Sequence, residues 1–166
     1  SGGPMISQEM EGKMNDDFSI THGYSARKRA QIQEAAGIIG INEAYLSDMV
    51  DAFYARVRVD VRLGPVFQVE IGEDWGPHLE RMKRFWASVA LNTGVYSGKP
   101  VAVHQRLHGV ERSDFDRWLG LFRATLEDTA PSQEAINYLM LRAERIALSL
   151  RNAMFEKTRD GVPALH

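Results

Sequence analysis

Apolar residues recur at helical spacing along most of the chain from Tyr24 onward. Residues three and four apart share one face of a helix, so such a stripe marks the side that packs on a core. Stripes of this kind predict helices within 25–40, near 42–59, 74–91 and 113–128, over the short segment 101–107, and from Pro131 to about Met154. No run of alternating apolar and polar residues between turns competes with them. The pattern therefore predicts an all-α fold with helices at varied angles.

Capping residues and breakers mark several of these boundaries. Short polar residues that can cap a helix N-terminus precede three of the stripes, namely Asn42, Asp74 and Ser113. Ser113 is followed three residues later by Asp116, which resembles a capping box with Asp in the acidic position. Gly64-Pro65 is expected to break the chain after the helix that ends near residue 59.

The chain is long enough for one domain with a proper core, preceded and followed by short tails. Residues 1–23 are expected to be a cleavage scar followed by a polar, aperiodic tail. We expect an extra N-terminal helix over 24–40, the main domain over 41–157 and a tail over 158–166. The basic run Arg27-Lys28-Arg29 weakens the extra helix, because cations are unfavourable near a helix N-terminus.

Composition narrows the partners and the chemistry. Of 166 residues, 44% are hydrophobic and 25% charged, and the formal net charge is −2, so neither a nucleic acid nor an acidic membrane is an expected partner. The longest apolar stretch, Ala35 to Ile41, is far too short to span a bilayer, and a cytoplasmic location fits. The absence of cysteine excludes disulfides, thiolate metal ligands and a cysteine nucleophile.

One predicted helix face begins with a histidine and continues with apolar residues: His78, Met82, Phe85, Trp86 and Val89. Apolar surroundings penalise the charged imidazole and leave two ring nitrogens that need partners. The pattern alone favours a half-exposed histidine at the edge of the core over a ligand.

A second candidate histidine, His104, follows Pro100 on the short segment after the loop-like region 92–100. The pattern alone again favours a structural role, and the pair His104 and His108 has no evident third metal ligand. Two aromatic residues, Tyr54 and Trp118, are interpreted in the same way as core aromatics whose polar atoms need a partner.

An ordered set of short motifs connects these residues and resembles the group III truncated haemoglobins over roughly residues 41–155. The motifs are Phe53-Tyr54-Ala55-Arg56-Val57-Arg58, Leu63-Gly64-Pro65-Val66-Phe67, Trp75-Gly76-Pro77-His78, Phe85-Trp86-Ala87-Ser88-Val89, Tyr96-Ser97-Gly98-Lys99-Pro100 with His104, and Phe115-Asp116-Arg117-Trp118-Leu119-Gly120-Leu121-Phe122. Each motif is weak alone, whereas the set in this order is specific.

The resemblance implies a shortened globin fold in which two pairs of helices sandwich haem b, with the N-terminal helix as an extension. His104 matches the proximal histidine that ligates iron. His78, Tyr54 and Trp118 match the distal histidine, tyrosine and tryptophan, and Phe67 matches the phenylalanine that stacks on the porphyrin. We favour a gating role for His78, because the other two distal residues already supply hydrogen-bond donors.

Further residues are expected beside the haem. Met82 matches an apolar distal position one turn after the distal histidine, and Phe85 and Trp86 are expected on the haem side of the same helix. Tyr96 and Arg106 are candidate partners of the haem propionates.

The function that the resemblance implies is binding of dioxygen or another small diatomic ligand at a five-coordinate haem iron. A polar distal pocket suits chemistry or sensing better than bulk carriage, so turnover of nitric oxide or peroxide with an external reductase stays open. Two alternatives remain: a gas or redox sensor that signals through the extension over 24–40, and a helical interaction module without haem.

Overall fold

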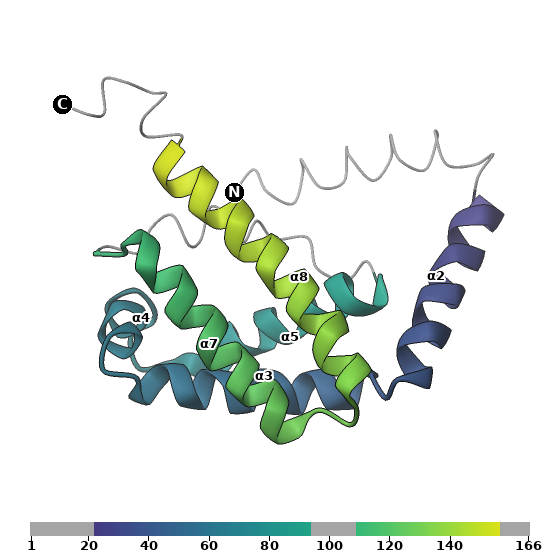
Figure 1. Ribbon diagram of the computed structural model, residues 1–166, viewed down its shortest axis with the longest axis horizontal. Helices are drawn as coiled ribbons and strands as arrows, with labels where there is room; N and C mark the ends of the chain where they lie inside the picture. The colour runs from purple at the N-terminus through teal and green to yellow at the C-terminus, as the bar shows by residue number, and fades with distance from the viewer. Residues whose placement is uncertain (1–21, 94–108, 157–166) are drawn as a thin grey trace.

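The computed structural model describes residues 22–93 and 109–156, and over these ranges the backbone forms helices and turns without strands (Figure 1). The helices are α2 (His22–Ile38), α3 (Glu43–Val59), α4 (Leu63–Ile71), α5 (Trp75–Leu91), α7 (Arg112–Thr129), α8 (Gln133–Arg151) and the π-helix η1 (Asn152–Glu156). Among these helices, none is long and apolar enough to cross a membrane. The all-α prediction is confirmed.

Two layers of helices make up the body of the molecule. In one layer α3 packs against α4 and α5, and in the other α7 packs against α8. The helices α7 and α8 run in opposite directions side by side, and α3 contacts α7 across the layers (Figure 1). This arrangement is the two-on-two sandwich that the resemblance implies.

The central helix is α3, because it contacts helices of both layers. It begins where predicted: the Asn42 side chain accepts a hydrogen bond from the Tyr45 N–H at 2.8 Å. Its apolar stripe is buried over the full length of the helix, at Leu46, Met49, Val50, Phe53, Tyr54 and Val57. Packing of this stripe on three neighbours fixes where the side chains of α3 meet those of α5 and α7.

The extra N-terminal helix predicted over 24–40 is α2, which ends at Ile38. It touches the body near its C-terminal end, where Ala36 is fully buried and Gln33 Nε2 donates to the Leu91 carbonyl at 3.1 Å. The rest of the helix stands apart from the two layers (Figure 1).

The predicted break at Gly64-Pro65 is wrong, because both residues lie in the first turn of α4. Backbone N–H groups in the first turn of a helix have no intrahelical partner, so a proline there costs the helix no hydrogen bond. Glycine is needed for a different reason: a Cβ on Gly64 would lie 2.6 Å from the Arg58 carbonyl oxygen. The helix α4 therefore starts in direct contact with the last turn of α3.

The predicted capping box at Ser113 and Asp116 is also wrong, because α7 begins two residues earlier. Its capping carboxylate belongs to Asp114, whose Oδ2 accepts from the Glu111 N–H at 2.8 Å. Asp74 does occupy the N-cap position of α5, but its side chain makes no capping hydrogen bond. The last helix, predicted from Pro131, begins at Gln133, and Ser132 caps it because Ser132 Oγ accepts from the Ala135 N–H at 3.1 Å.

The contact at Gly64 gives a first prediction. Gly64→Ala should lower the free energy of unfolding by about 1–3 kcal/mol, because the new methyl group meets backbone that cannot rotate away. Gly120→Ala is the matched control: Gly120 is exposed on α7 with open space at its Cβ, and alanine should be neutral or stabilise by up to about 1 kcal/mol. Urea unfolding measures both. Equal effects of the two substitutions would contradict the close approach of α4 to α3.

Candidate functional site

An apolar cavity lies where α4, α7, α8 and η1 meet. It encloses about 440 Å³ of space not filled by atoms, including space open to solvent. Its described lining is apolar except for one carboxylate, and consists of Leu63, Val66, Phe67, Val110, Asp114, Phe115, Trp118, Ala147, Leu150 and Met154. Such a lining suits a ligand that is itself largely apolar.

A cluster of aromatic rings borders this cavity and is centred on Phe53 of α3. The Phe53 ring meets Tyr54, Trp118 and Phe122 edge-on, with ring centroids 4.9, 5.4 and 5.2 Å apart. Tyr54 in turn lies edge-on to Phe67 at 6.2 Å. Because Phe67 and Trp118 line the cavity, the cluster connects its wall to Tyr54.

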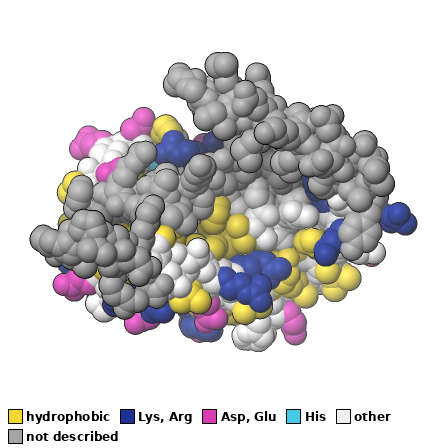
Figure 2. All heavy atoms as spheres, turned by 90° about the horizontal axis from the view of Figure 1, so that it is seen from above, with side chains coloured by type: hydrophobic (Ala, Val, Ile, Leu, Met, Phe, Trp, Pro, Cys, Tyr) yellow, Lys and Arg dark blue, Asp and Glu magenta, His cyan; other side chains and the backbone are white. Residues whose placement is uncertain are grey.

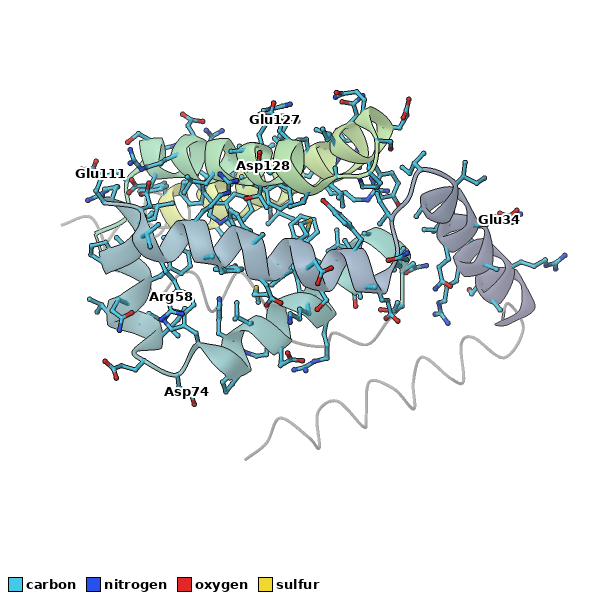
Figure 3. All side chains as sticks on the ribbon, turned by 90° about the horizontal axis from the view of Figure 1, so that it is seen from below. Glu34, Arg58, Asp74, Glu111, Glu127 and Asp128 are labelled. Carbon is cyan, nitrogen blue, oxygen red and sulfur yellow. The ribbon has the colours of Figure 1, made fainter. Side chains whose placement is uncertain are left out.

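His78 belongs to the same cluster and is only 3% exposed. Its ring is perpendicular to Tyr54 at 5.0 Å and to Trp75 at 5.8 Å, and its Nε2 is shielded from solvent. Arg58 of α3 covers this group from outside, with its guanidinium 4.8 Å from the centre of the Trp75 ring (Figure 3). The burial excludes the half-exposed histidine that the sequence pattern alone favours.

Of the predicted distal residues, the structure therefore brings Tyr54 and His78 together and connects Trp118 to them through Phe53. Trp118 lines the cavity, whereas Tyr54 and His78 lie behind Phe67 and outside its lining. Tyr54 lies in the C-terminal half of α3, Phe67 in the middle of α4 and His78 in the first turn of α5, and each is on the buried face of its helix.

The predicted haem-side residues of α5 occupy different positions. Met82 and Trp86 are buried, Phe85 is half-buried, and none of the three lines this cavity. The Trp86 ring stacks on Phe122 at 5.0 Å, and Phe122 stacks on Trp118 at 5.9 Å. Trp86 and Phe122 thus support Trp118, which lines the cavity, from behind. Three further predicted residues, His104, Tyr96 and Arg106, lie outside the described residues.

Two ion pairs that sequence reasoning missed anchor the start of α7 beside the cavity. Arg62 donates from Nε and Nη2 to the two carboxylate oxygens of Asp114, each at 2.8 Å, and from Nη2 to the Gly109 carbonyl at 2.5 Å. Arg117 donates to both oxygens of Asp60 at 2.7 and 2.9 Å. Figure 3 shows Glu111, which precedes α7, at this end of the bundle.

Both carboxylates remain charged because of these donors. The Arg117 guanidinium, helped by the Arg62 and Leu63 backbone N–H groups, lowers the pKa of Asp60 from 3.8 to about 2. The Arg62 guanidinium lowers the pKa of Asp114. A sequence signal existed for Asp60 alone, since an aspartate just before Leu63 can cap the helix that begins there.

Comparisons with known proteins bear on the whole domain. No protein-family model matches the chain. It is 33% identical over 119 residues to "Group 3 truncated hemoglobin ctb" of Campylobacter jejuni, a match that covers 70% of this chain and 93% of that protein. Its fold is similar to the crystal structure of the group III truncated hemoglobin from Campylobacter jejuni, with a TM-score of 0.66 and 32% identity over 70% of this chain and 94% of that one. The similarity therefore extends over nearly the full length of both relatives.

The ion pair of Asp60 predicts a specific pH dependence of stability. The pKa of Asp60 is lower in the folded protein than in the unfolded chain, so its contribution is complete above about pH 4 and is lost as the pH falls through about 2. Asp60→Asn should cost about 1–3 kcal/mol of unfolding free energy at pH 7, and less as the pH falls below 4. Urea unfolding between pH 2 and 7 measures the difference.

Glu127→Gln is the matched control, because Glu127 is exposed on α7 (Figure 3). It should unfold within about 0.5 kcal/mol of the parent protein. A difference between Asp60→Asn and the parent that stays constant over the whole pH range would contradict the charged pair.

Proposed function

The chain belongs to the group III truncated haemoglobins, and from that premise we propose that it binds haem b in the apolar cavity together with dioxygen or another small diatomic ligand. The observation that carries the proposal is the cavity lined by Phe67 and Trp118 next to the buried pair Tyr54 and His78. An interaction module without haem has no need of this combination of an apolar space and shielded donors.

The residues that line the cavity fit haem. The porphyrin is a large apolar ring, and nine of the ten described lining residues are apolar or aromatic. The tenth, Asp114, has its charge balanced by Arg62, so the wall holds no uncompensated charge. Haem b, when bound, supplies the iron to which a diatomic ligand coordinates.

His104 is the residue proposed to hold the iron. The support comes from the resemblance of the segment 96–104 to the family and from Val110, which follows His104 by six positions and lines the cavity. A neutral imidazole is a good iron ligand, and the other ring N–H needs an acceptor that fixes the ring orientation.

From the resemblance we assign Tyr54 and Trp118 as hydrogen-bond donors to the ligand: Trp118 lines the cavity itself, and Tyr54 packs against Phe67 in its wall. A tyrosine O–H and an indole N–H both donate without carrying a charge, so they can be buried in an apolar site. The rings of both residues pack edge-on against Phe53, and this packing fixes the position of each donor before the ligand arrives. His78, edge-on to Tyr54, is the proposed gate on this side.

Two donors around one ligand suit retention of dioxygen for chemistry or sensing. We propose turnover of nitric oxide or peroxide with an external reductase as the activity to test first. The sensor alternative has one observation in its favour: α2 contacts α5, the helix that carries His78, through Gln33 and the Leu91 carbonyl.

Haem binding gives the prediction on which the function depends. The purified protein should bind one haem per chain with a Soret band, and His104→Ala should lose it or keep haem only with added imidazole, because no other residue is proposed to hold the iron. The absorption spectrum and the haem content measure this result. His108→Ala is the matched control and should keep the parent spectrum. If His104→Ala keeps a normal haem content, His104 is not the iron ligand and His108 becomes the next candidate.

The two donors give the next prediction. A hydrogen bond contributes about 0.5–1.5 kcal/mol when neutral and about 1.5–3 when one partner is charged. Dioxygen takes up partial negative charge on binding, so we expect an intermediate value for Tyr54→Phe and for Trp118→Phe. Each substitution should speed dioxygen release by roughly 10-fold, at about 1.4 kcal/mol per tenfold change. Both keep an aromatic ring in the cluster.

Stopped-flow dissociation of dioxygen and carbon monoxide is the measurement. Carbon monoxide is less polar when bound and should respond less, which serves as an internal control. The double variant should show less than the sum of the two single effects, because both donors share one ligand. If both single variants release dioxygen at the parent rate, neither Tyr54 nor Trp118 contacts the ligand.

A further inference from the structure

The four most exposed large hydrophobic side chains of the described residues lie in two regions. They are Ile38 at the end of α2 and Val59, Val61 and Val69 around α4, all between 76% and 83% exposed. Val61, Pro65 and Val69 follow each other four positions apart, and Pro65 is exposed as well. We call Val59, Val61, Pro65 and Val69 the outer stripe of α4. Exposed apolar side chains that gather in this way mark a surface for another protein.

Acidic side chains follow the outer stripe at the C-terminal end of α4. Glu70, Glu73 and Asp74 are all exposed, and no basic residue occurs between Leu63 and Asp74. In the described part of the chain none of these three carboxylates forms an ion pair. The outside of α4 therefore presents an apolar surface with negative charge at one end.

The helix α2 has the complementary character. Lys28, Gln31, Ala35 and Ile38 are exposed and share one face, since they follow each other at intervals of three and four positions. We call these four residues the outer face of α2. Three basic residues, at positions 27–29, stand against one acidic residue in the whole helix. The outer face is therefore apolar at the C-terminal end of α2 and lies next to positive charge toward its N-terminus.

Most of α2 also lacks the packing that normally stabilises a helix. It touches the body near its C-terminal end, where Ala36 is buried and Gln33 donates to the Leu91 carbonyl. Isolated helices a few turns long are marginal in water, and helices in proteins gain most of their stability from tertiary packing. A second surface laid against the outer face of α2 would supply that packing.

Within one chain the two surfaces cannot meet, because α2 and α4 lie at opposite ends of the body (Figure 1). The labelled residues Glu34 of α2 and Asp74, which follows α4, show the same separation (Figure 3). A two-fold axis between two chains, however, can bring each α2 to the α4 of the other chain. Such a pair is closed, because both contacts are then satisfied and no surface is left for a third chain.

We propose that a second copy of this chain is the partner, and that the outer face of α2 of each copy packs on the outer stripe of α4 of the other. The inference goes beyond the proposed function and does not depend on haem. Each contact lies one helix away from a cavity, since the other side of α4 supplies Leu63, Val66 and Phe67 to its wall.

The two surfaces match in length and in charge. At a rise of 1.5 Å per residue, Lys28 lies about 15 Å from Ile38, and the nine-residue helix α4 is about 13 Å long. Antiparallel packing of the two helices places Ile38 against Val61 and Lys28 against Glu70. Each contact alone is small, and the two-fold axis doubles the buried area toward the range of a weak specific dimer.

Sedimentation equilibrium of the full-length chain over a range of protein concentrations measures the association. We expect a reversible monomer–dimer equilibrium that weakens at high salt, because salt screens the charged ends. Val69→Lys should raise the dissociation constant at least about 10-fold, since the dimer would place the new charge against apolar side chains. Leu148→Lys is the matched control: Leu148 is 49% exposed on α8, outside both surfaces, and this variant should keep the parent constant.

Charge reversal tests which surfaces meet. One variant carries Lys28→Glu and Gln31→Glu on α2, and the other carries Glu70→Lys and Glu73→Lys at α4. Each variant alone should be monomeric where the parent is dimeric, because both of its contacts would bring like charges together. The two variants mixed in equal amounts should form a heterodimer, because each α2 then meets an α4 of opposite charge. All four positions are exposed, so the substitutions should leave the fold intact.

A parent protein that sediments as a monomer at every concentration would overturn the proposed dimer. Equal dissociation constants for Val69→Lys and Leu148→Lys would show that the outer stripe is not in the interface. Charge variants that dimerise alone, or that stay monomeric after mixing, would show that α2 does not meet α4 of the other copy. The absorption spectrum tests haem binding separately, so failure of the dimer and failure of the proposed function are distinguishable.

Discussion

The edge-on packing of Phe53 is the contact on which the two layers and the site both depend. Phe53 is 1% exposed, and its ring touches Tyr54 on its own helix and Trp118 and Phe122 on α7. Each such aromatic pair contributes about 0.5–1.5 kcal/mol beyond the burial of its surface. The rings of Tyr54 and Trp118 are thus held in place by packing against Phe53. Stability of the core and placement of the two proposed donors have the same origin.

The opposite end of the cavity depends on charge instead. Asp114 is only 5% exposed in a wall that is otherwise apolar, where an unpaired carboxylate would cost several kcal/mol. Arg62 and the Glu111 N–H compensate it, and Arg62 reaches the Gly109 carbonyl as well. One guanidinium therefore joins the start of α4, the turn before α7 and the first turn of α7. On the face that Figure 2 shows, basic and acidic side chains lie interspersed among hydrophobic ones.

The sequence predicted those features that depend on neighbours along the chain. Helical stripes and the cap at Asn42 are local, and both are confirmed within the described residues, whereas the predicted segment 101–107 lies outside them. Gly64 was misinterpreted because its reason is a carbonyl of the preceding helix, which only the packed structure reveals. The pair Asp60 and Arg117 is separated by 57 positions, and no periodicity connects them. The proximity of Tyr54 to His78 came from family resemblance, since the pattern alone favoured a histidine at the core edge.

The first turns of α7 bring the two constraints together. Asp114 and Arg117 anchor this stretch to the corner between α3 and α4, while Phe115 and Trp118, each one position further on, line the cavity. Residues that form ion pairs alternate with residues that line the cavity within positions 114–118, so the ion pairs fix the position of both rings. Trp118 is held further by its stack on Phe122, whereas Phe115 meets only the ring of Phe155 among the described aromatic residues. Trp118 therefore has more support from neighbouring rings than Phe115, although the same ion pairs anchor both residues.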